Sequence, residues 1–280
     1  MKHIAHEIDR SRQQVISVSG GKDSTATLLK ALEEYEKEQL IVIFNDTGWE
    51  HPCTYDYLDY LESTLDIEIK RLTPKDNIDL PDLIRKMKQF PHPSYRFCTE
   101  TLKQNPFMKF IEDNKLFDST NWVGVRRAES IARRRKYLEV DPRKEYPVRM
   151  FFTSYTYDLK RVRMRFPVIH LTVLEIFEYI KSKGIDVNPL YKKGHTRVGC
   201  YPCLLSSKKD IMRLLGDPVG LERIDKLITI EEEIGCKYNV INLVRMRGQL
   251  EDLGGFEGVN ELLETEGAFS CKDSVVDCGK

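Results

Sequence analysis

The sequence predicts an α/β protein, with a doubly wound, mostly parallel sheet flanked by helices and a helical C-terminal extension. Two observations carry this prediction. Segments of strand length alternate with segments of helical periodicity along the first half of the chain, which is the rhythm of βαβ units. Residues 40–44 form a nearly continuous apolar run, which is typical of a strand buried on both faces of a parallel sheet.

The two periodicities give the individual elements. Strands are expected at residues 14–18, 40–44, 67–72 and 121–125. Helices are expected at residues 25–38, 52–65 and 172–183, and Thr172 and Gly184 are the expected N-cap and stop of the last one. Residues 166–169 have the composition of a core segment. From Ser207 the pattern is helical and polar, and the Gly- and Glu-rich tail after Gly254 is expected to be loosely ordered.

Length and charge indicate how the chain is organised. Its 280 residues allow one domain with an appendage, which we place at residues 1–205 and 206–280. Lys+Arg and Asp+Glu balance at 44 each, so net charge indicates no particular partner. Residues 126–165 are strongly basic, and an insertion is expected at about 133–165. No apolar run reaches the ~20 residues of a membrane span and the N-terminus lacks a secretory pattern, so a cytoplasmic enzyme is expected.

A phosphate-binding loop is expected between the first strand and the first helix. Two glycines permit a tight turn with exposed backbone N–H groups, and the helix N-terminus favours an anion. Lys22 adds a full positive charge, and Asp23 suits a loop that holds Mg²⁺ or needs orienting. The spacing is that of neither a Walker loop nor a dinucleotide fingerprint. The expected binding residues of this loop are Ser17, Ser19, Gly20, Gly21, Lys22, Asp23, Ser24 and Thr25.

A second polar loop, with Asp46 and Thr47, follows the strand at residues 40–44. It lies at the carboxyl edge of the expected sheet, where open α/β folds bind ligands. Asp46 and Thr47 are therefore expected near the nucleotide or its metal, and a plain turn is the alternative.

The first loop resembles the PP-loop of ATP pyrophosphatases, whose pattern is Ser-Gly-Gly-x-Asp-Ser. Enzymes of that adenine nucleotide alpha hydrolase-like superfamily cleave ATP between its α- and β-phosphates and transfer AMP to a substrate oxygen. Residues 122–130 and 188–199 resemble the Gly-x-Arg-Arg-x-x-Ser and His-Pro-Leu-Trp…Gly-x-x-Ser-Val-Gly segments of phosphoadenylyl-sulfate (PAPS) reductases, so the resemblance covers about residues 14–210. It implies that the nucleotide also contacts Gly124, Arg126, Arg127, Glu129 and Arg197.

Two departures from the reductases favour ATP as the nucleotide. The reductases have a degenerate phosphate loop, whereas this loop is intact. They also carry a catalytic cysteine in a C-terminal Glu-Cys-Gly-Leu/Ile-His motif. This chain ends in Asp277-Cys278-Gly279-Lys280, without the histidine.

The seven cysteines indicate metal or redox chemistry, because an odd number in a reducing compartment is unlike a disulfide framework. Cys98 and the Cys-x-x-Cys pair Cys200 and Cys203 precede expected helices, whose N-termini favour thiolates. With Cys278 or Cys271 as a fourth ligand they would suit a [4Fe-4S] cluster or Zn²⁺, and a metal-free redox pair is the alternative. The arrangement resembles DndC-type proteins of DNA phosphorothioation and phage "PAPS reductase family" proteins, in which an iron–sulfur cluster is implicated in sulfur transfer.

The expected function is adenylation of an acceptor by ATP with Mg²⁺, with release of pyrophosphate, in a sulfur-transfer reaction such as nucleic-acid thiolation. The expected catalytic residues are Lys22, Asp23, Arg126 and Cys200. For residues 133–136 a solvated helix face is favoured over a contact surface. If the basic stretch 126–165 binds a partner, a nucleic-acid backbone is expected, and the aromatic residues at 151, 152, 155 and 157 either stack on bases or pack a hairpin. A sulfur-donor protein is a further expected partner. Reduction of PAPS or adenylyl sulfate to sulfite, and a non-catalytic nucleotide-binding subunit, are the alternative functions.

Overall fold

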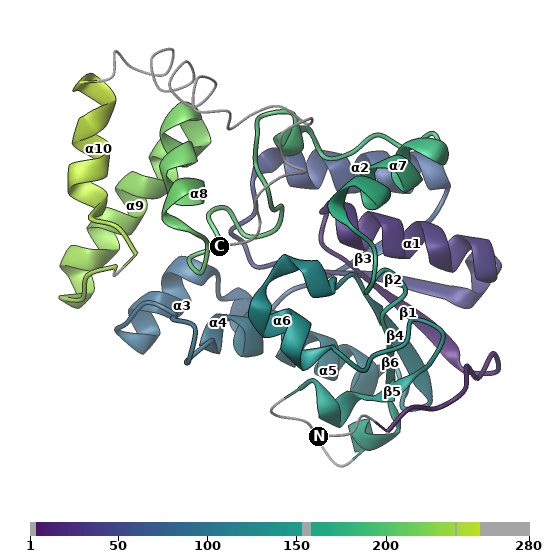
Figure 1. The fold of residues 1–280 in the computed structure, drawn as a ribbon. Coiled ribbons are helices and arrows are strands. Elements are labelled where there is room, and N and C mark those ends of the chain that lie inside the picture. The colour runs from purple at the N-terminus through teal and green to yellow at the C-terminus, as the bar shows by residue number, and fades with distance from the viewer. Residues whose placement is uncertain (1–3, 153–157, 239, 253–280) are drawn as a thin grey trace.

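The centre of the molecule is a six-stranded sheet in the order β3-β2-β1-β4-β6-β5 (Figure 1). The computed structural model describes residues 4–152, 158–238 and 240–252. All neighbouring strands are parallel except β5, which runs antiparallel to β6 at one edge. This confirms the mostly parallel sheet expected from the sequence. The strands are β1 (Gln13–Val18), β2 (Leu40–Asn45), β3 (Ile69–Leu72), β4 (Ser119–Val123), β5 (Tyr146–Pro147) and β6 (Arg163–Arg165).

The two central strands are buried on both faces. Val15 of β1 lies opposite Ile41 of β2 and Asn121 of β4, and both Val15 and its neighbour Ile16 are fully buried. Because side chains alternate between the faces of a sheet, a strand covered on both sides needs apolar residues at consecutive positions. The apolar run at residues 40–44 has the same cause.

Helices cover both faces of the sheet, as Figure 1 shows. On one face α1 (Lys22–Glu34), α2 (Pro52–Leu65) and α7 (Val173–Ser182) bury apolar side chains against the sheet. On the other face α5 (Asn105–Asp113) packs together with the residues around β5 and β6. The doubly wound arrangement is therefore confirmed.

Helix ends follow local capping chemistry. Thr172 caps α7 as expected, because its side chain accepts a hydrogen bond from Glu175 N at 3.2 Å and its own N–H donates to Glu175 Oε2 at 2.7 Å. Helix α1 begins at Lys22, three residues earlier than expected, and ends at Glu34 because Tyr35 is extended. Strand β4 ends at Val123, since the chain turns there and Val125 N bonds back to Val123 O.

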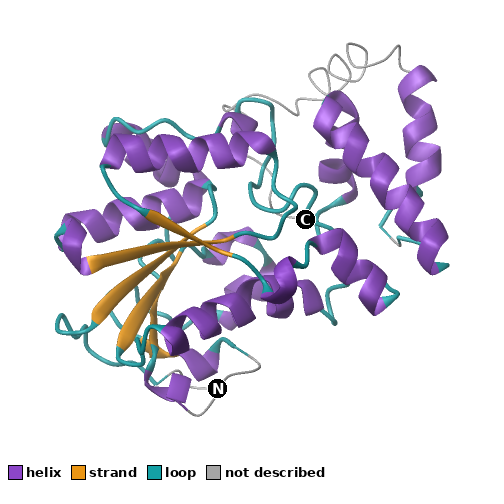
Figure 2. Cartoon of the chain, turned by 180° about the vertical axis from the view of Figure 1, so that it is seen from behind, coloured by secondary structure: helices purple, strands orange, loops and turns teal. Residues whose placement is uncertain are grey.

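The described C-terminal helices lie beyond the carboxyl ends of the strands (Figure 2). Helices α8 (Lys208–Met212), α9 (Pro218–Ile234) and α10 (Leu243–Asp252) surround a core of their own together with α3 (Leu80–Met87) and α4 (Phe97–Thr99). Helix α6 (Ile131–Lys136) lies near α4. A π-helical segment, Glu100–Gln104, joins α4 to α5. Short 3-10 helices lie at Lys37–Gln39, Lys75–Asn77, Arg127–Glu129, Val148–Met150, Asp158–Arg161, Pro189–Tyr191 and Arg213–Gly216.

The fold does not test two of the sequence expectations. The tail after Gly254, with Cys271 and Cys278, lies outside the described residues. The division of the chain at about residue 205 stays a prediction. Within the described ranges, none of the helices has the length and apolar character that a membrane crossing requires.

Candidate active site

The phosphate loop leaves the carboxyl end of β1, and the turn after β4 lies beside it. Strand β1 is bonded to β2 on one side and to β4 on the other, so the chain connections run in opposite directions from this point. Open α/β sheets bind ligands outside the carboxyl ends of the strands at such a switch point. The fold thus brings residues 19–24 and 124–126 to the place where a ligand is expected.

Hydrogen bonds within the loop fix its shape. Ser19 N donates to Ser24 Oγ at 3.0 Å, and Ser24 Oγ donates to Gly21 O at 2.9 Å. Gly20 has a φ of +69°, and a Cβ at this position would lie 2.7 Å from Thr54 Cγ2, so only glycine fits. Helix α1 starts directly after this turn, and the unpaired N–H groups of a first helical turn attract anions.

A buried guanidinium points to an anionic ligand at the loop. Arg126 is only 3% exposed; its Nε bonds Asp23 Oδ1, while its Nη1 is buried and has no hydrogen-bond partner in the described part of the chain. Lys22 Nζ lies 3.5 Å from Asp23 Oδ2, so two cations share one carboxylate. An unsatisfied N–H on a buried charged group is destabilising. A phosphate oxygen would remove that penalty, so the residues present fit a nucleotide phosphate.

The turn after β4 is built to approach the loop closely. A Cβ at Gly124 would lie 2.6 Å from Asp23 O and from Ser24 N, so a larger residue would push the two segments apart. Glu129 Oε1 accepts a hydrogen bond from Arg126 N at 2.9 Å. The carboxylate therefore holds the turn that carries Arg126, and a nucleotide contact of Glu129 stays a prediction.

Lys22 ties the phosphate loop to the segment that leads into the Cys-x-x-Cys pair. Its backbone N–H donates to Tyr191 Oη at 2.9 Å, and its Nζ donates to Thr196 O at 3.1 Å. Burial lowers the pKa of this ammonium. The described contacts of Lys22 are thus made within the protein, and its action on the leaving pyrophosphate stays a prediction.

The loop after β2 contacts the cysteine segment. Asp46 Oδ1 accepts hydrogen bonds from Gly48 N at 2.9 Å and from Tyr55 Oη at 2.8 Å. Thr47 Oγ1 donates to Glu50 Oε1 at 2.8 Å and lies 3.6 Å from Cys200 Sγ. A nucleotide contact of Asp46 or Thr47 stays a prediction, because both side chains already have partners in the loop.

The structure brings Cys98, Cys200 and Cys203 together. Burial raises the pKa of the Cys98 thiol, and the nearby Cys203 raises it further. Burial also raises the pKa of Cys200, to about 11, although Lys103 beside it acts in the opposite direction. The attraction of Cys200 raises the pKa of the Lys103 ammonium. In this state Cys98 and Cys200 are therefore held as neutral thiols near pH 7.

A helix N-terminus does not activate the Cys-x-x-Cys pair in the way the sequence suggested. Helix α8 begins only at Lys208, capped by Ser207, so Cys200 and Cys203 lie in a loop and out of reach of its dipole. Cys98 does lie in the first turn of α4, yet burial dominates its pKa. No group of three or more His, Cys, Asp or Glu side chains in the described part of the chain is arranged to hold a metal ion.

Four other predicted binding residues lie as follows. Arg127 Nε donates to Tyr137 O at 2.9 Å and its Nη2 bonds Val140 O, so this guanidinium anchors the following segment. Ser17 Oγ donates to Asn121 Oδ1 at 2.8 Å, a bond between β1 and β4. Thr25 Oγ1 lies 3.2 Å from Tyr57 Oη. Arg197 is exposed. Nucleotide contacts of these four residues stay predictions.

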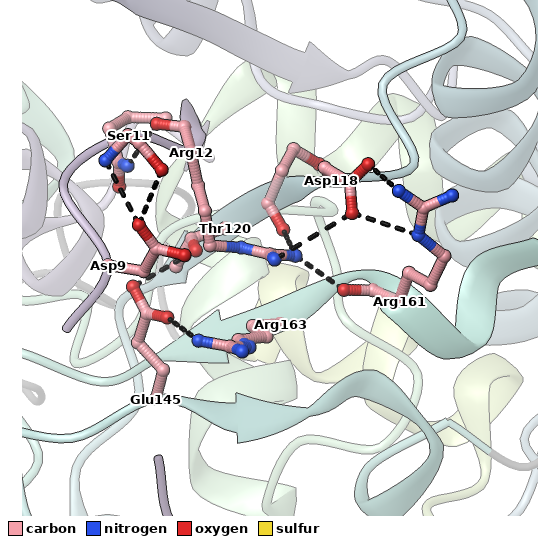
Figure 3. A network of polar contacts seen from close by, with 10 residues as sticks. Asp9, Ser11, Arg12, Asp118, Thr120, Glu145, Arg161 and Arg163 are labelled. Atoms are coloured by element: carbon pink, nitrogen blue, oxygen red, sulfur yellow. Dashed lines mark hydrogen bonds and ion pairs between the residues drawn. The ribbon is translucent and has the colours of Figure 1, made fainter. Parts of the chain in front are cut away.

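Several cations of the basic stretch 126–165 are paired within the fold. Arg165 bonds Glu34 at 2.7 Å, and Arg163 bonds Glu145 at 3.0 Å. Figure 3 shows the second pair within a polar network, where Arg161 bonds Asp118. These pairs hold β6 and its neighbours in place. Phe151 is buried, Phe152 is partly buried, and Tyr155 and Tyr157 lie outside the described residues.

Three residues near the site were not predicted as site residues. Glu50, Lys103 and Tyr191 reach it through tertiary packing, as their contacts with Thr47, Cys200 and Lys22 show. A signal existed for Tyr191 in the resemblance of residues 188–199 and for Glu50 in the polar loop after residues 40–44, whereas no motif or spacing distinguishes Lys103.

The chain is similar to several known proteins. The family model of the phosphoadenosine phosphosulfate reductase domain matches residues 13–206. The chain is 31% identical over 191 residues to an uncharacterized protein of Methanocaldococcus jannaschii. That match covers 68% of this chain and 35% of the archaeal protein. It is also 29% identical over 247 residues to a 37.8 kDa uncharacterized protein of Escherichia phage 186. That match covers 71% of this chain and 69% of the phage protein. The chain thus spans about a third of the archaeal relative.

Reductases are among the more distant relatives. The adenosine 5'-phosphosulfate reductase of Oceanobacillus iheyensis is 27% identical over 170 residues, which cover 58% of this chain and 60% of that enzyme. Among solved structures, the phosphoadenylyl-sulfate reductase of Candida auris matches with a TM-score of 0.46 and 14% identity, over 68% of this chain and 82% of that one. The family model runs from β1 through the Cys-x-x-Cys pair and covers more than half of the sequence. This chain therefore belongs to the phosphoadenosine phosphosulfate (PAPS) reductase domain family.

Proposed function

We propose that this protein is an ATP pyrophosphatase that adenylates an acceptor in a sulfur-transfer reaction. The observation that carries this proposal is the unpartnered, buried Nη1 of Arg126, which lies beside an intact Ser-Gly-Gly-x-Asp-Ser loop at the switch point of the sheet. A ligand with several adjacent phosphates supplies acceptors for Arg126 and for the N-terminus of α1 together.

In the first step an acceptor oxygen attacks the α-phosphorus of ATP. An oxygen–phosphorus bond forms, the anhydride bond to the β-phosphate breaks, and pyrophosphate leaves with the electron pair. Arg126 and the N-terminus of α1 stabilise the negative charge that develops. Asp23 is the proposed Mg²⁺ ligand of the loop, and Lys22 is the proposed second cation beside the leaving group.

In the second step a hydrosulfide-level sulfur attacks the acceptor atom that carries the adenylate. A bond to sulfur forms, the bond to oxygen breaks and AMP leaves, so no electrons are transferred. Cys98, Cys200 and Cys203, with Cys278 or Cys271, are the proposed ligands of a [4Fe-4S] cluster, with Zn²⁺ as the alternative. The electrostatic effects among Cys98, Cys200 and Cys203 support this proposal, although the described side chains are not arranged to hold a metal ion, so the ligands would have to move closer together. A bound cluster would supply a place for the sulfur.

The alternative function is reduction of an adenylyl sulfate to sulfite by a thiol. The similarity to adenosine 5'-phosphosulfate reductases favours it, and so does the group of three cysteines near the site. The intact phosphate loop favours the first proposal over it.

Product analysis separates the candidate functions. Protein purified without oxygen is incubated with Mg·ATP and nucleic acid, or with PAPS and a thiol reductant. We expect AMP and pyrophosphate from ATP, and no sulfite from PAPS. Sulfite without ATP cleavage would establish the reductase. Binding of ATP without turnover would indicate a nucleotide-binding subunit. Mass spectrometry of DNA and tRNA from cells with and without the protein then checks for replacement of oxygen by sulfur.

A further inference from the structure

An exposed cationic face lies next to Cys98, on residues outside the phosphate loop. It consists of the turn at residues 92–96 and helix α6, and it presents His92, Tyr95, Arg96, Arg134 and Arg135, all of them exposed. We call it the turn–α6 face. Figure 1 shows α6 beside α4, the helix that carries Cys98.

Electrostatic contacts join the two parts of this face. Burial lowers the pKa of the Lys136 ammonium, and the positive charges of Arg96 and Arg133 lower it further. Arg96 also acts on the Cys98 thiol, whose pKa it lowers against the larger effect of burial. Arg96 is therefore close enough to act on both Cys98 and Lys136, which agrees with the position of α6 beside α4 in Figure 1.

Within the described residues 126–140, few carboxylates are available to neutralise the arginines of α6. Residues 126–140 contain two, Glu129 and Glu139. Glu129 bonds Arg133 and the backbone N–H of Arg126, which leaves the guanidinium groups of Arg134 and Arg135 facing solvent. Elsewhere in the basic stretch the arginines differ in this respect, because Arg161, Arg163 and Arg165 are each paired with a carboxylate.

The face also offers apolar and aromatic surface. Tyr95 is 44% exposed, and its ring lies 5.4 Å from that of Phe97, which is buried and so fixes its position. Helix α6 buries none of its side chains. Ile131, the first residue of α6, is 69% exposed, and Leu138, two residues beyond its end, is 65% exposed. A cationic surface with an oriented aromatic ring suits a polyanion that carries flat bases.

We propose that the turn–α6 face binds single-stranded nucleic acid and holds it as the acceptor between Cys98 and the phosphate loop. This inference rests on the proposed function and names its substrate class. Arg96, Arg134 and Arg135 bind the sugar-phosphate backbone, and Tyr95 stacks on one unpaired base. A duplex keeps its bases stacked inside and presents none to Tyr95. An acidic protein partner would use the arginines without a need for the ring.

The test is direct binding, measured by fluorescence anisotropy with labelled single-stranded DNA and RNA of mixed sequence at several salt concentrations. The variant Arg96→Ala/Arg134→Ala/Arg135→Ala is expected to weaken binding at least 10-fold. It is also expected to lower the slope of log K against log salt by about 2, since each phosphate contact on a single strand contributes about 0.7. Tyr95→Ala is expected to weaken binding at least 5-fold with an unchanged slope.

The matched control is Arg143→Ala/Arg161→Ala, which removes two exposed guanidinium groups of the same basic stretch that are paired with Asp141 and Asp118. Its affinity is expected to stay within twofold of the parent protein. An equal loss in this control, or no binding by the parent protein at low salt, would overturn the proposal. Equal competition by poly-glutamate, with no effect of Tyr95→Ala, would replace the nucleic acid by an acidic protein.

The outcome is separable from that of the proposed function. ATP cleavage is measured on the same samples, with and without the oligonucleotide. Binding that follows the variants, without any AMP, would leave the face established and refute the pyrophosphatase. AMP formation without oligonucleotide binding would support the pyrophosphatase and refute the binding of nucleic acid by the turn–α6 face.

Discussion

Replacement of Arg126 by alanine tests the nucleotide site most specifically. The Arg126 guanidinium is 3% exposed and bonds Asp23, and its Nη1 has no hydrogen-bond partner among the described residues. If Nη1 binds a phosphate oxygen, the variant loses a charge-assisted hydrogen bond worth about 1.5–3 kcal/mol. That free energy corresponds to a dissociation constant for nucleotide about 10- to 150-fold higher.

Isothermal titration calorimetry with Mg²⁺ and α,β-methylene-ATP measures this change without turnover. Arg165→Ala is the matched control, because this guanidinium is also buried and paired with a carboxylate but bonds Glu34 and is not a predicted nucleotide contact. We expect its affinity to stay within about threefold of the parent protein, while its melting temperature falls. Thermal unfolding of both variants without ligand shows that they are folded. Native affinity in folded Arg126→Ala would refute the reasoning.

Three further predictions concern the loop, the cysteines and the pH dependence. Gly124→Ala places a Cβ 2.6 Å from the backbone of the phosphate loop, and overpacking of this kind is worth about 1–3 kcal/mol. We expect a lower melting temperature and at least 10-fold weaker nucleotide binding, whereas Gly248→Ala, with no atom nearby, should be neutral or stabilising. In reduced, metal-free protein the pH midpoint of Cys200 alkylation should lie near 11. Lys103→Met should raise this midpoint, because Lys103 lowers the pKa of the Cys200 thiol. A midpoint at the ordinary pKa of a thiol would contradict the prediction. Burial lowers the pKa of His195 to about 4 from 6.5, so the unfolded chain takes up this proton first, and stability should fall by on the order of 3 kcal/mol between pH 6.5 and pH 4. Denaturant titration of His195→Gln should show a shallower decline over that window, and an identical decline would contradict the assignment.

Local sequence patterns were sufficient to predict strands β1 to β4 and the turn at the start of α1, whereas the short strands β5 and β6 were not predicted. The apolar run at residues 40–44 and the Gly-Gly turn at the start of α1 act through near neighbours, so their structure follows from the residues themselves. The two hydrogen bonds between Thr172 and Glu175 that cap α7 also join residues only three positions apart. Element ends shifted by up to four residues because contacts such as Val125 N to Val123 O decide them.

The environment of the site residues could not be predicted in this way. Arg126 and Arg127 are adjacent and chemically identical in the sequence, yet one faces Asp23 and the other bonds Tyr137. The thiols were expected to ionise readily, but burial dominates the pKa of Cys98 and Cys200. Burial depends on how the C-terminal helices pack over the cysteine segment, and short-range spacing carries no information about that packing.

The phosphate loop beside Arg126 is the centre of the account, and a crystal structure with Mg²⁺ and α,β-methylene-ATP tests it most directly. We predict that the phosphates lie at the N-terminus of α1, with one of their oxygens within hydrogen-bond distance of Arg126 Nη1. A triphosphate bound elsewhere on the molecule, with residues 19–24 empty and Nη1 still unpaired, would contradict the account.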